Sequence, residues 1–254
     1  MRKFLCLPGA LTNAQTMRIQ MGPIVNELES DKSAVFYFTE GVIEENPPED
    51  ISPWFGNPPH LRFFKYEAGV EPLTILNGLR DFEHDGSPEE AMREFLGDDS
   101  APLRQDVRRM LDDLCRTIEE HGPFYGVIGY SEGATVASTL LVDDLKRRRL
   151  EGLGSSFQCA IFFAGWPPLA TEGKNTLLLS DETGEIITIP TFHVVGASDP
   201  YLPGCMALYN ICDSDVAEMF DHGKGHMIPR DAVTVKELSS ALRGFLEGVD
   251  GRLH

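Results

Sequence analysis

The sequence has few basic residues and no long apolar run. Its 254 residues include 22 lysines and arginines against 40 aspartates and glutamates, a formal net charge of −18. This balance disfavours general affinity for nucleic acid or for an anionic membrane surface. No apolar run approaches the roughly 18 residues that a membrane-spanning helix requires. We therefore expect no membrane span, no nucleic-acid partner and a small-molecule substrate.

Cysteine is also scarce. The five cysteines are odd in number and scattered, without a Cys-x-x-Cys pair: Cys6, Cys115, Cys159, Cys205 and Cys212. This pattern excludes a regular disulfide framework, and no histidine stands near them at the spacing of a metal site. We expect reduced thiols in a cytoplasmic protein that carries no metal and no cofactor. The N-terminal residues read as a buried strand, because their apolar stretch is too short for a secretory signal.

Short, wholly apolar runs alternate with amphipathic helical patterns along the chain. The runs cover residues 4–7, 35–38, 124–130, 159–165 and 190–196. Strands that are apolar on both faces are typical of a parallel sheet covered by helices on both sides. We therefore predict an α/β fold with a mostly parallel central sheet. A single domain of residues 1–254 is long but compatible with such a fold.

Prolines and aromatic residues crowd the stretch from Thr39 to about Gly86, which shows little regular periodicity. The stretch is too apolar for a disordered linker. We predict an irregular insertion over about residues 39–100 that forms a lid or a pocket wall. The aromatic candidates for lining a substrate pocket are Trp54, Phe55, Phe63, Phe64 and Tyr66. Packing of the loop onto the core is an equally good interpretation for each of them.

The most informative stretch is Gly129-Tyr130-Ser131-Glu132-Gly133, which follows an apolar run and leads into a helical pattern. Strand, Gly-x-Ser-x-Gly and helix in this order are typical of a nucleophile elbow, a tight turn that presents a serine hydroxyl. Side chains at positions 129 and 133 would collide with the neighbouring strand and helix, which accounts for the glycines. Ser131 is therefore the candidate nucleophile. A chance match to a short pattern is the alternative.

Partners for Ser131 are expected beyond the later strands, because ligand sites in open α/β sheets lie at the carboxyl ends of strands. Asp199 follows one of the apolar runs, and His226 precedes the last helical pattern. A serine hydroxyl needs an imidazole to accept its proton and a carboxylate to orient that ring. The chain order Ser131, Asp199, His226 is the order used by hydrolases with such an elbow. Alternatives are a plain turn role for Asp199 and a catalytic role for His222.

Acyl transfer also requires backbone donors for the oxyanion. The amide of Glu132, directly after the nucleophile, is one expected donor. The loop after the first strand is expected to supply the other, with Ala10 as first choice and Leu11 as the alternative. The Glu132 side chain is not needed for this role, and we expect it to point to solvent or to make a loop contact.

Four motifs together resemble one family. They are Pro-Gly-x-x-Thr-Asn-Ala near the start, Gly-Tyr-Ser-Glu-Gly-Ala at the elbow, Gly-x-x-Asp-Pro after a late strand and His-x-x-Gly-His-x-Ile-Pro near the end. The combination is similar to the FSH family of small serine hydrolases over nearly the whole chain. Membership implies an α/β-hydrolase fold, a triad of Ser131, Asp199 and His226, and esterase or thioesterase activity without a cofactor. Family members often have His-Gly where this chain has Pro8-Gly9, which bears on the placement of the oxyanion donors.

The resemblance also implies a class of substrate. Some fungal members hydrolyse the thioester that tethers a finished polyketide to the carrier domain of its synthase. We accordingly expect a serine hydrolase that cleaves a thioester or ester of a hydrophobic, polyketide-like acyl chain through an acyl-enzyme on Ser131. The alternatives are a carboxylesterase or deacetylase acting on a finished secondary metabolite, a reaction at a carbon–carbon bond, and a non-catalytic binding protein. The basic run Lys146-Arg147-Arg148-Arg149 either docks an acidic carrier domain or complements a helix end.

Overall fold

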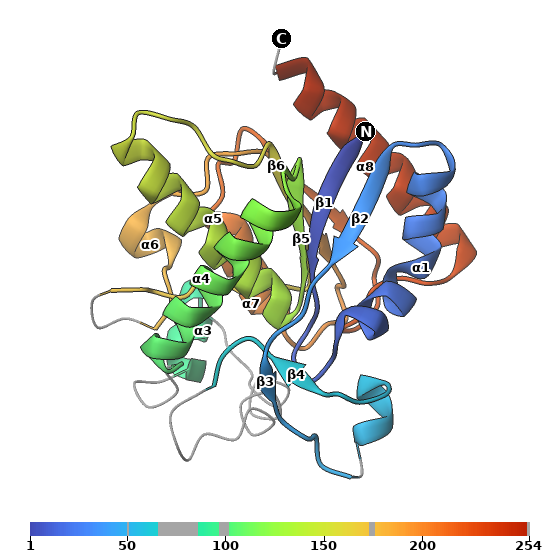
Figure 1. Cartoon of the computed structure of the whole chain (residues 1–254), viewed down its shortest axis with the longest axis horizontal. Helices are drawn as coiled ribbons and strands as arrows, with labels where there is room; N and C mark the ends of the chain where they lie inside the picture. The colour runs from blue at the N-terminus through green and yellow to red at the C-terminus, as the bar shows by residue number, and fades with distance from the viewer. Residues whose placement is uncertain (50, 66–85, 97–101, 173–175, 253–254) are drawn as a thin grey trace.

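A six-stranded parallel sheet forms the centre of the protein (Figure 1). The structure is a computed structural model that describes residues 1–49, 51–65, 86–96, 102–172 and 176–252. The strands are β1 (Arg2–Leu7), β2 (Ala34–Phe38), β5 (Gly126–Tyr130), β6 (Cys159–Phe163), β7 (Thr191–Val195) and β8 (Ala217–Asp221). Their order across the sheet is β2-β1-β5-β6-β7-β8. The predicted parallel sheet is thereby confirmed.

Helices cover both faces of this sheet. One face carries α1 (Ala14–Ser30) and α8 (Ala232–Arg252), and the other carries α4 (Arg104–His121), α5 (Glu132–Leu150) and α7 (Leu202–Asn210). Figure 1 shows α1 and α8 on one side of the strands and α4 and α5 on the other. The short helix α6 (Ser180–Thr183) lies between β6 and β7 in the chain. Within the described ranges, every helix falls short of the length or the apolar character that a membrane span requires.

Side chains of each strand alternate between the two helical layers. In β1, Leu5 and Leu7 belong to the hydrophobic cluster of α4 and α5, whereas Phe4 and Cys6 belong to the cluster of α1 and α8. All four are at most 1% exposed. Both faces of the strand are therefore buried, which is the reason that the runs are apolar throughout.

The predicted insertion contains several short elements among its described residues. They are β3 (Ile43–Glu44), the 3-10 helix η1 (Ser52–Phe55), β4 (Leu61–Arg62) and α3 (Pro88–Leu96). Strands β3 and β4 form a separate antiparallel pair. An isolated bridge between Thr12 and Leu61 joins this pair to the loop that follows β1. The insertion is thus fastened beside the carboxyl end of the central sheet.

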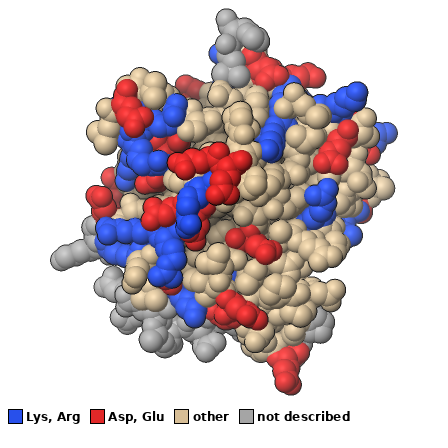
Figure 2. Space-filling model, in the orientation of Figure 1, with Lys and Arg blue, Asp and Glu red and all other residues tan. Residues whose placement is uncertain are grey.

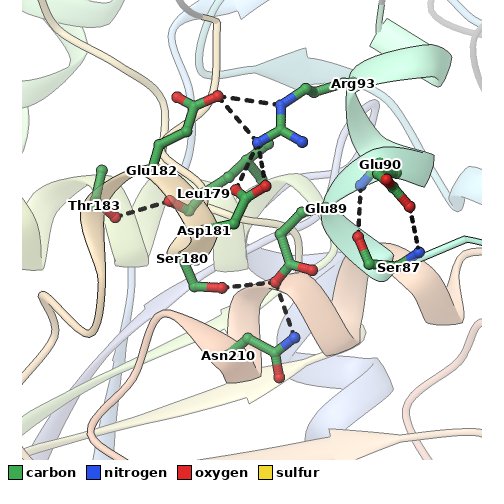
Figure 3. A network of polar contacts seen from close by, with 10 residues as sticks. All are labelled: Ser87, Glu89, Glu90, Arg93, Leu179, Ser180, Asp181, Glu182, Thr183 and Asn210. Atoms are coloured by element: carbon green, nitrogen blue, oxygen red, sulfur yellow. Dashed lines mark hydrogen bonds and ion pairs between the residues drawn. The ribbon is translucent and has the colours of Figure 1, made fainter.

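Polar contacts fix helix α3 to the rest of the molecule (Figure 3). Its start is a capping box, in which the Glu90 amide donates to Ser87 Oγ at 3.1 Å and the Ser87 amide donates to Glu90 Oε2 at 2.8 Å. Contacts to α6 and α7 join Glu89 to Ser180 and Asn210, and Arg93 to Asp181 and Glu182. The end of the insertion is therefore tied to the segments on either side of β7.

The strand order reverses between β1 and β5. The chain runs from β1 to β2 on one side and then returns to β5 on the other side of β1. Ligands of open α/β sheets bind beyond the carboxyl ends of the strands at such a switch point. Leu7 and Gly129 are paired across β1 and β5. The loop after β1 and the turn after β5 therefore emerge side by side at this point.

Candidate active site

Ser131 occupies the turn between β5 and α5. Its backbone has φ 53° and ψ −121°, in a region that disfavours residues with a side chain. Backbone bonds hold this turn: the Ser131 amide donates to the Phe163 carbonyl at 2.9 Å, and the Ser131 carbonyl accepts the amides of Ala134 at 2.9 Å and Thr135 at 3.3 Å. The predicted strand, strained turn and helix are all present.

The two glycines of the motif are required by close backbone contacts. A Cβ on Gly129 would lie 2.3 Å from the Gly133 carbonyl oxygen, and a Cβ on Gly133 would lie 2.1 Å from the Leu7 carbonyl oxygen. Both distances are far inside van der Waals contact. The expected collisions with the helix and with the neighbouring strand are thus confirmed, and close packing fixes the turn against the end of β1.

Two loops that follow β7 and β8 bring an aspartate and a histidine toward Ser131. The loop after β7 packs tightly on the loop after β8: a Cβ on Gly196 would lie 1.9 Å from the Lys224 carbonyl oxygen. The Ser198 amide donates to that same carbonyl at 3.2 Å. Asp199 and His226 extend from these two joined loops, so their relative position is set by the backbone.

Hydrogen bonds link the three polar side chains. The Nε2 atom of His226 lies 3.0 Å from the Ser131 Oγ, and its Nδ1 atom lies 2.9 Å from Asp199 Oδ2. The other Asp199 oxygen accepts the Tyr201 amide at 2.8 Å. The Asp199 side chain is fully buried, whereas the His226 side chain is 20% exposed. The arrangement leaves one edge of the imidazole accessible and shields the carboxylate that orients it.

Aromatic side chains surround the His226 ring. Tyr130 stacks on it at 5.5 Å between centroids and donates from its hydroxyl to the His226 carbonyl at 3.3 Å. Tyr201 meets it edge-on at 4.8 Å, and Trp166 meets Tyr201 at 6.0 Å. Burial raises the pKa of Tyr130, and so does the nearby Asp199, so the hydroxyl keeps its proton. Trp166 and Tyr201 were not among the residues predicted from the sequence; the available signal was their position after the apolar runs of β6 and β7.

The predicted oxyanion loop lies against the nucleophile. A Cβ on Gly9 would lie 3.4 Å from Ser131 Cβ, so the backbone at this position passes directly beside the serine. Ala10 follows it and is partly exposed. Leu11 has φ 57°, and its side chain is buried. The loop thus lies beside the nucleophile, and its role as an oxyanion donor, from Ala10 or Leu11, stays a prediction.

The Glu132 side chain makes a loop contact, which was one of its two expected orientations. Its carboxylate accepts two hydrogen bonds from Arg62, at 2.9 Å from Nε and 2.6 Å from Nη2. The Phe63 amide donates to its other oxygen at 3.0 Å. Both partners of the ion pair are buried, with side chains 3% and 5% exposed. Arg62 is a further residue that sequence analysis missed, because no local motif marks its partner.

The aromatic candidates for a pocket wall fall into separate groups. Phe63 and Phe64 are 6% and 1% exposed and belong to the hydrophobic cluster of α3, α4 and α5, so they hold the insertion on the core. Trp54 is 83% exposed, and Phe55, also in η1, is half-buried. Tyr66 lies outside the described residues. Phe63 and Phe64 therefore pack on the core, and a pocket-lining role stays a prediction for all five aromatic residues.

Two further histidines have structural positions. His193 in β7 is a core histidine: it is 1% exposed and bonds through Nε2 to Thr191 Oγ1 at 3.0 Å. His222 is partly buried, and its Nδ1 accepts the Lys224 amide at 3.2 Å. The contact with Ser131 is made by His226, so His222 does not take the alternative position.

The basic run 146–149 lies near the end of α5 remote from Ser131. With a rise of about 1.5 Å per residue, Arg147 is roughly 24 Å along the helix from the serine. Arg147 also pairs with Asp143 at 2.7 Å, and Arg148 donates to the Gly154 carbonyl. Figure 2 shows basic and acidic side chains interleaved on the face that carries α4. This placement argues against the docking hypothesis and favours the helix-end interpretation, because a carrier bound there would present its acyl chain at the wrong end of the sheet.

A strained serine on a parallel α/β sheet, joined through histidine to a buried aspartate, is the arrangement of serine hydrolases with the α/β-hydrolase fold. The profile of the family described as Serine hydrolase (FSH1) matches residues 1–238. The chain therefore belongs to this family of hydrolases.

Relatives of similar sequence are named as enzymes of this class, and solved structures share the fold. "Esterase FPY3" of Fusarium mangiferae is 26% identical over 94% of each chain. "Thioesterase FSL2" of Gibberella zeae is 30% identical over 94% of this chain and 90% of its own. A carboxylesterase from Mesorhizobium loti superimposes with a TM-score of 0.53 at 15% identity, covering 96% of this chain and 88% of its own. That structural likeness confirms the predicted fold. The assignment to the serine hydrolases rests on the family match.

Proposed function

We propose that Ser131 is the nucleophile of a two-step hydrolysis. His226 Nε2 accepts the hydroxyl proton while Ser131 Oγ attacks the substrate carbonyl carbon. The tetrahedral intermediate collapses to an acyl-enzyme, and the proton passes from His226 to the departing thiolate or alkoxide. His226 then takes a proton from a water molecule as the water oxygen attacks the acyl carbon. The bond between the acyl carbon and Ser131 Oγ breaks, His226 returns the proton to Oγ, and the free acid leaves.

The observation that carries this proposal is the continuous set of hydrogen bonds from Ser131 through His226 to Asp199. Asp199 holds the proton of the ring on Nδ1, which leaves Nε2 free to act as the base toward Ser131. Burial of the carboxylate strengthens its attraction to the imidazolium that forms during attack, since water screens it less.

Two backbone amides are proposed to bind the oxyanion. Glu132 supplies one, at the first residue of α5, where the helix dipole also favours negative charge. The loop after β1 supplies the other, from Ala10 with Leu11 as the alternative. The contact of Gly9 with Ser131 supports this location.

The proposed substrate is a thioester or ester of a hydrophobic, polyketide-like acyl chain. In this role the carrier domain of a synthase presents the acyl chain as a thioester. Thiolates leave readily, so a triad with modest acid catalysis is sufficient. Support comes from the names of the relatives, which include a thioesterase, and from the aromatic surroundings of His226, where Tyr201 and Trp166 offer apolar surface. A cytoplasmic location is proposed with this role.

The second candidate is a carboxylesterase or deacetylase that acts on a finished metabolite. It is favoured by relatives named as esterases, among them those from Fusarium mangiferae and Gibberella moniliformis. Both candidates use the same residues and differ in the acyl group and the leaving group.

A substrate panel separates the two candidates. Wild type and Ser131→Ala would be assayed with p-nitrophenyl esters and N-acetylcysteamine thioesters of increasing acyl length, and with an acylated carrier domain. We expect kcat/KM to rise with acyl length, thioesters to be preferred, and Ser131→Ala to be inactive while folded. A preference for acetyl esters would select the second candidate, and turnover by folded Ser131→Ala would reject the proposed nucleophile.

A further inference from the structure

We propose that the tetrapeptide His60-Leu61-Arg62-Phe63 clamps both halves of the oxyanion site, and that Arg62 is its principal positioning residue. The inference rests on the proposed function, because it concerns the two backbone segments expected to bind the oxyanion. These segments belong to different parts of the chain, one after β1 and one after β5. The tetrapeptide comes from the insertion and contacts both.

The first contact is with the residue after the nucleophile. Arg62 donates from Nε and Nη2 to one oxygen of Glu132, and the Phe63 amide donates to the other. Glu132 is also the first residue of α5, so its backbone amide is the donor expected at the oxyanion. Three hydrogen bonds to one side chain therefore restrain the main chain that carries this amide.

The second contact is with the loop after β1. His60 Nδ1 lies 3.0 Å from the Leu11 carbonyl oxygen, and the Leu61 amide donates to the Thr12 carbonyl at 3.2 Å. Thr12 Oγ1 in turn donates to the Gly9 carbonyl at 2.6 Å, which closes the loop on itself. Leu11 has φ 57°, a backbone conformation that persists only when its surroundings hold it. The tetrapeptide supplies that support.

The tetrapeptide is itself held in place. A Cβ on Gly41 would lie 2.1 Å from the Arg62 carbonyl oxygen, so the chain before β3 passes directly over β4. Arg62 Nη1 also reaches Glu45 Oε1 at 3.4 Å. A shift of β4 would therefore disturb both oxyanion segments together.

A buried ion pair suits positioning better than stability. Desolvation of the two charges offsets much of their attraction, and an apolar pair of similar volume is often as stable. The planar guanidinium instead fixes direction, since its two N–H groups meet one carboxylate in a set geometry. Oxyanion donors must be positioned accurately relative to the oxyanion, because small displacements of catalytic groups lower the rate strongly.

The test compares two variants that treat the pair differently. Arg62→Met leaves the Glu132 carboxylate buried without its cation, and it is expected to destabilise the protein. The double variant Arg62→Met with Glu132→Gln removes both charges and keeps an acceptor for the Phe63 amide, so it is expected to fold. Asp144→Asn is the matched control, because Asp144 is a buried carboxylate of the same helix that accepts from Ser155 and Ser156, far from Ser131.

The assay uses an ester that the wild-type protein hydrolyses. We expect the folded double variant to lose about 10- to 100-fold in kcat with little change in KM, which is less than the loss caused by removing an oxyanion donor altogether. The midpoint of its kcat/KM profile against pH should stay at the wild-type value, because His226 and Asp199 are untouched. Arg62→Lys should recover part of the rate. Asp144→Asn should keep the wild-type kcat.

The outcomes are distinguishable. A double variant with wild-type kcat, or one in which KM and the pH midpoint change along with kcat, would overturn the clamp while leaving the proposed function standing. A wild-type protein that neither turns over esters nor is acylated at Ser131 would reject the proposed function and the clamp with it.

Discussion

The buried histidine of β7 makes the stability of the protein sensitive to acid. His193 is 1% exposed, with Phe162 and Tyr209 against its ring and Thr191 bonded to its Nε2. Burial lowers the pKa of His193 from 6.5 to about 3. The folded state therefore binds its proton less readily than the unfolded chain does. Its neutral form contributes full stability above pH 6.5, and this contribution is lost as the pH falls from there toward 3.

The magnitude follows from the two pKa values. One pH unit corresponds to about 1.36 kcal/mol for a single proton, so between pH 7.5 and pH 5 the unfolded state gains about 2 kcal/mol from His193. Urea unfolding of wild type and His193→Gln at both pH values measures the effect. The variant should be less stable at pH 7.5, and its loss on acidification should be about 2 kcal/mol smaller. Phe162→Leu serves as a control, because it disturbs the same packing without a titrating group. Parallel pH dependences for wild type and His193→Gln would refute the reasoning.

Three further predictions concern the packing of glycines, the triad and a helix cap. Gly133→Ala should destabilise the protein by about 1–3 kcal/mol in urea unfolding, because the added Cβ would collide with the Leu7 carbonyl. Gly244→Ala in α8 has open space around it and should stabilise the protein by about 0.5–1 kcal/mol. Equal effects of the two substitutions would contradict the packing argument. Asp199→Asn should lower kcat on the order of 10³- to 10⁴-fold with the fold kept, and an unchanged kcat would remove Asp199 from the site. Ser87→Ala should lower the thermal midpoint through a cost of about 1 kcal/mol, since it removes a cap; no change would mean that the capping box adds nothing.

Elements that local chemistry determines can be predicted from the sequence. Asn13 caps α1 by accepting the Thr16 amide, and Ser87 and Glu90 form a capping box at the start of α3. The five apolar runs form the strands β1, β2, β5, β6 and β7 of the sheet. In each of these cases neighbouring residues carry the whole signal, so a single sequence is sufficient.

Contacts between distant segments could not be predicted in the same way. The pair of Arg62 and Glu132 joins residues 70 positions apart, and no local pattern couples them. Helix α7 was missed because it is short and contains Pro203 and Gly204, which ordinarily interrupt helices. The aromatic residues of the insertion were offered as pocket-lining candidates, but an aromatic run looks the same whether it lines a pocket or, as for Phe63, packs on a core.

The most direct test of the account is covalent labelling of the nucleophile. Purified wild type and Ser131→Ala would be incubated with a fluorophosphonate probe, and intact mass and peptide mapping would locate any adduct. We expect one adduct per chain on Ser131 in wild type and none in the variant, because His226 Nε2 is hydrogen-bonded to this hydroxyl and can accept its proton. No adduct in folded wild type, or an adduct that persists in Ser131→Ala, would contradict it.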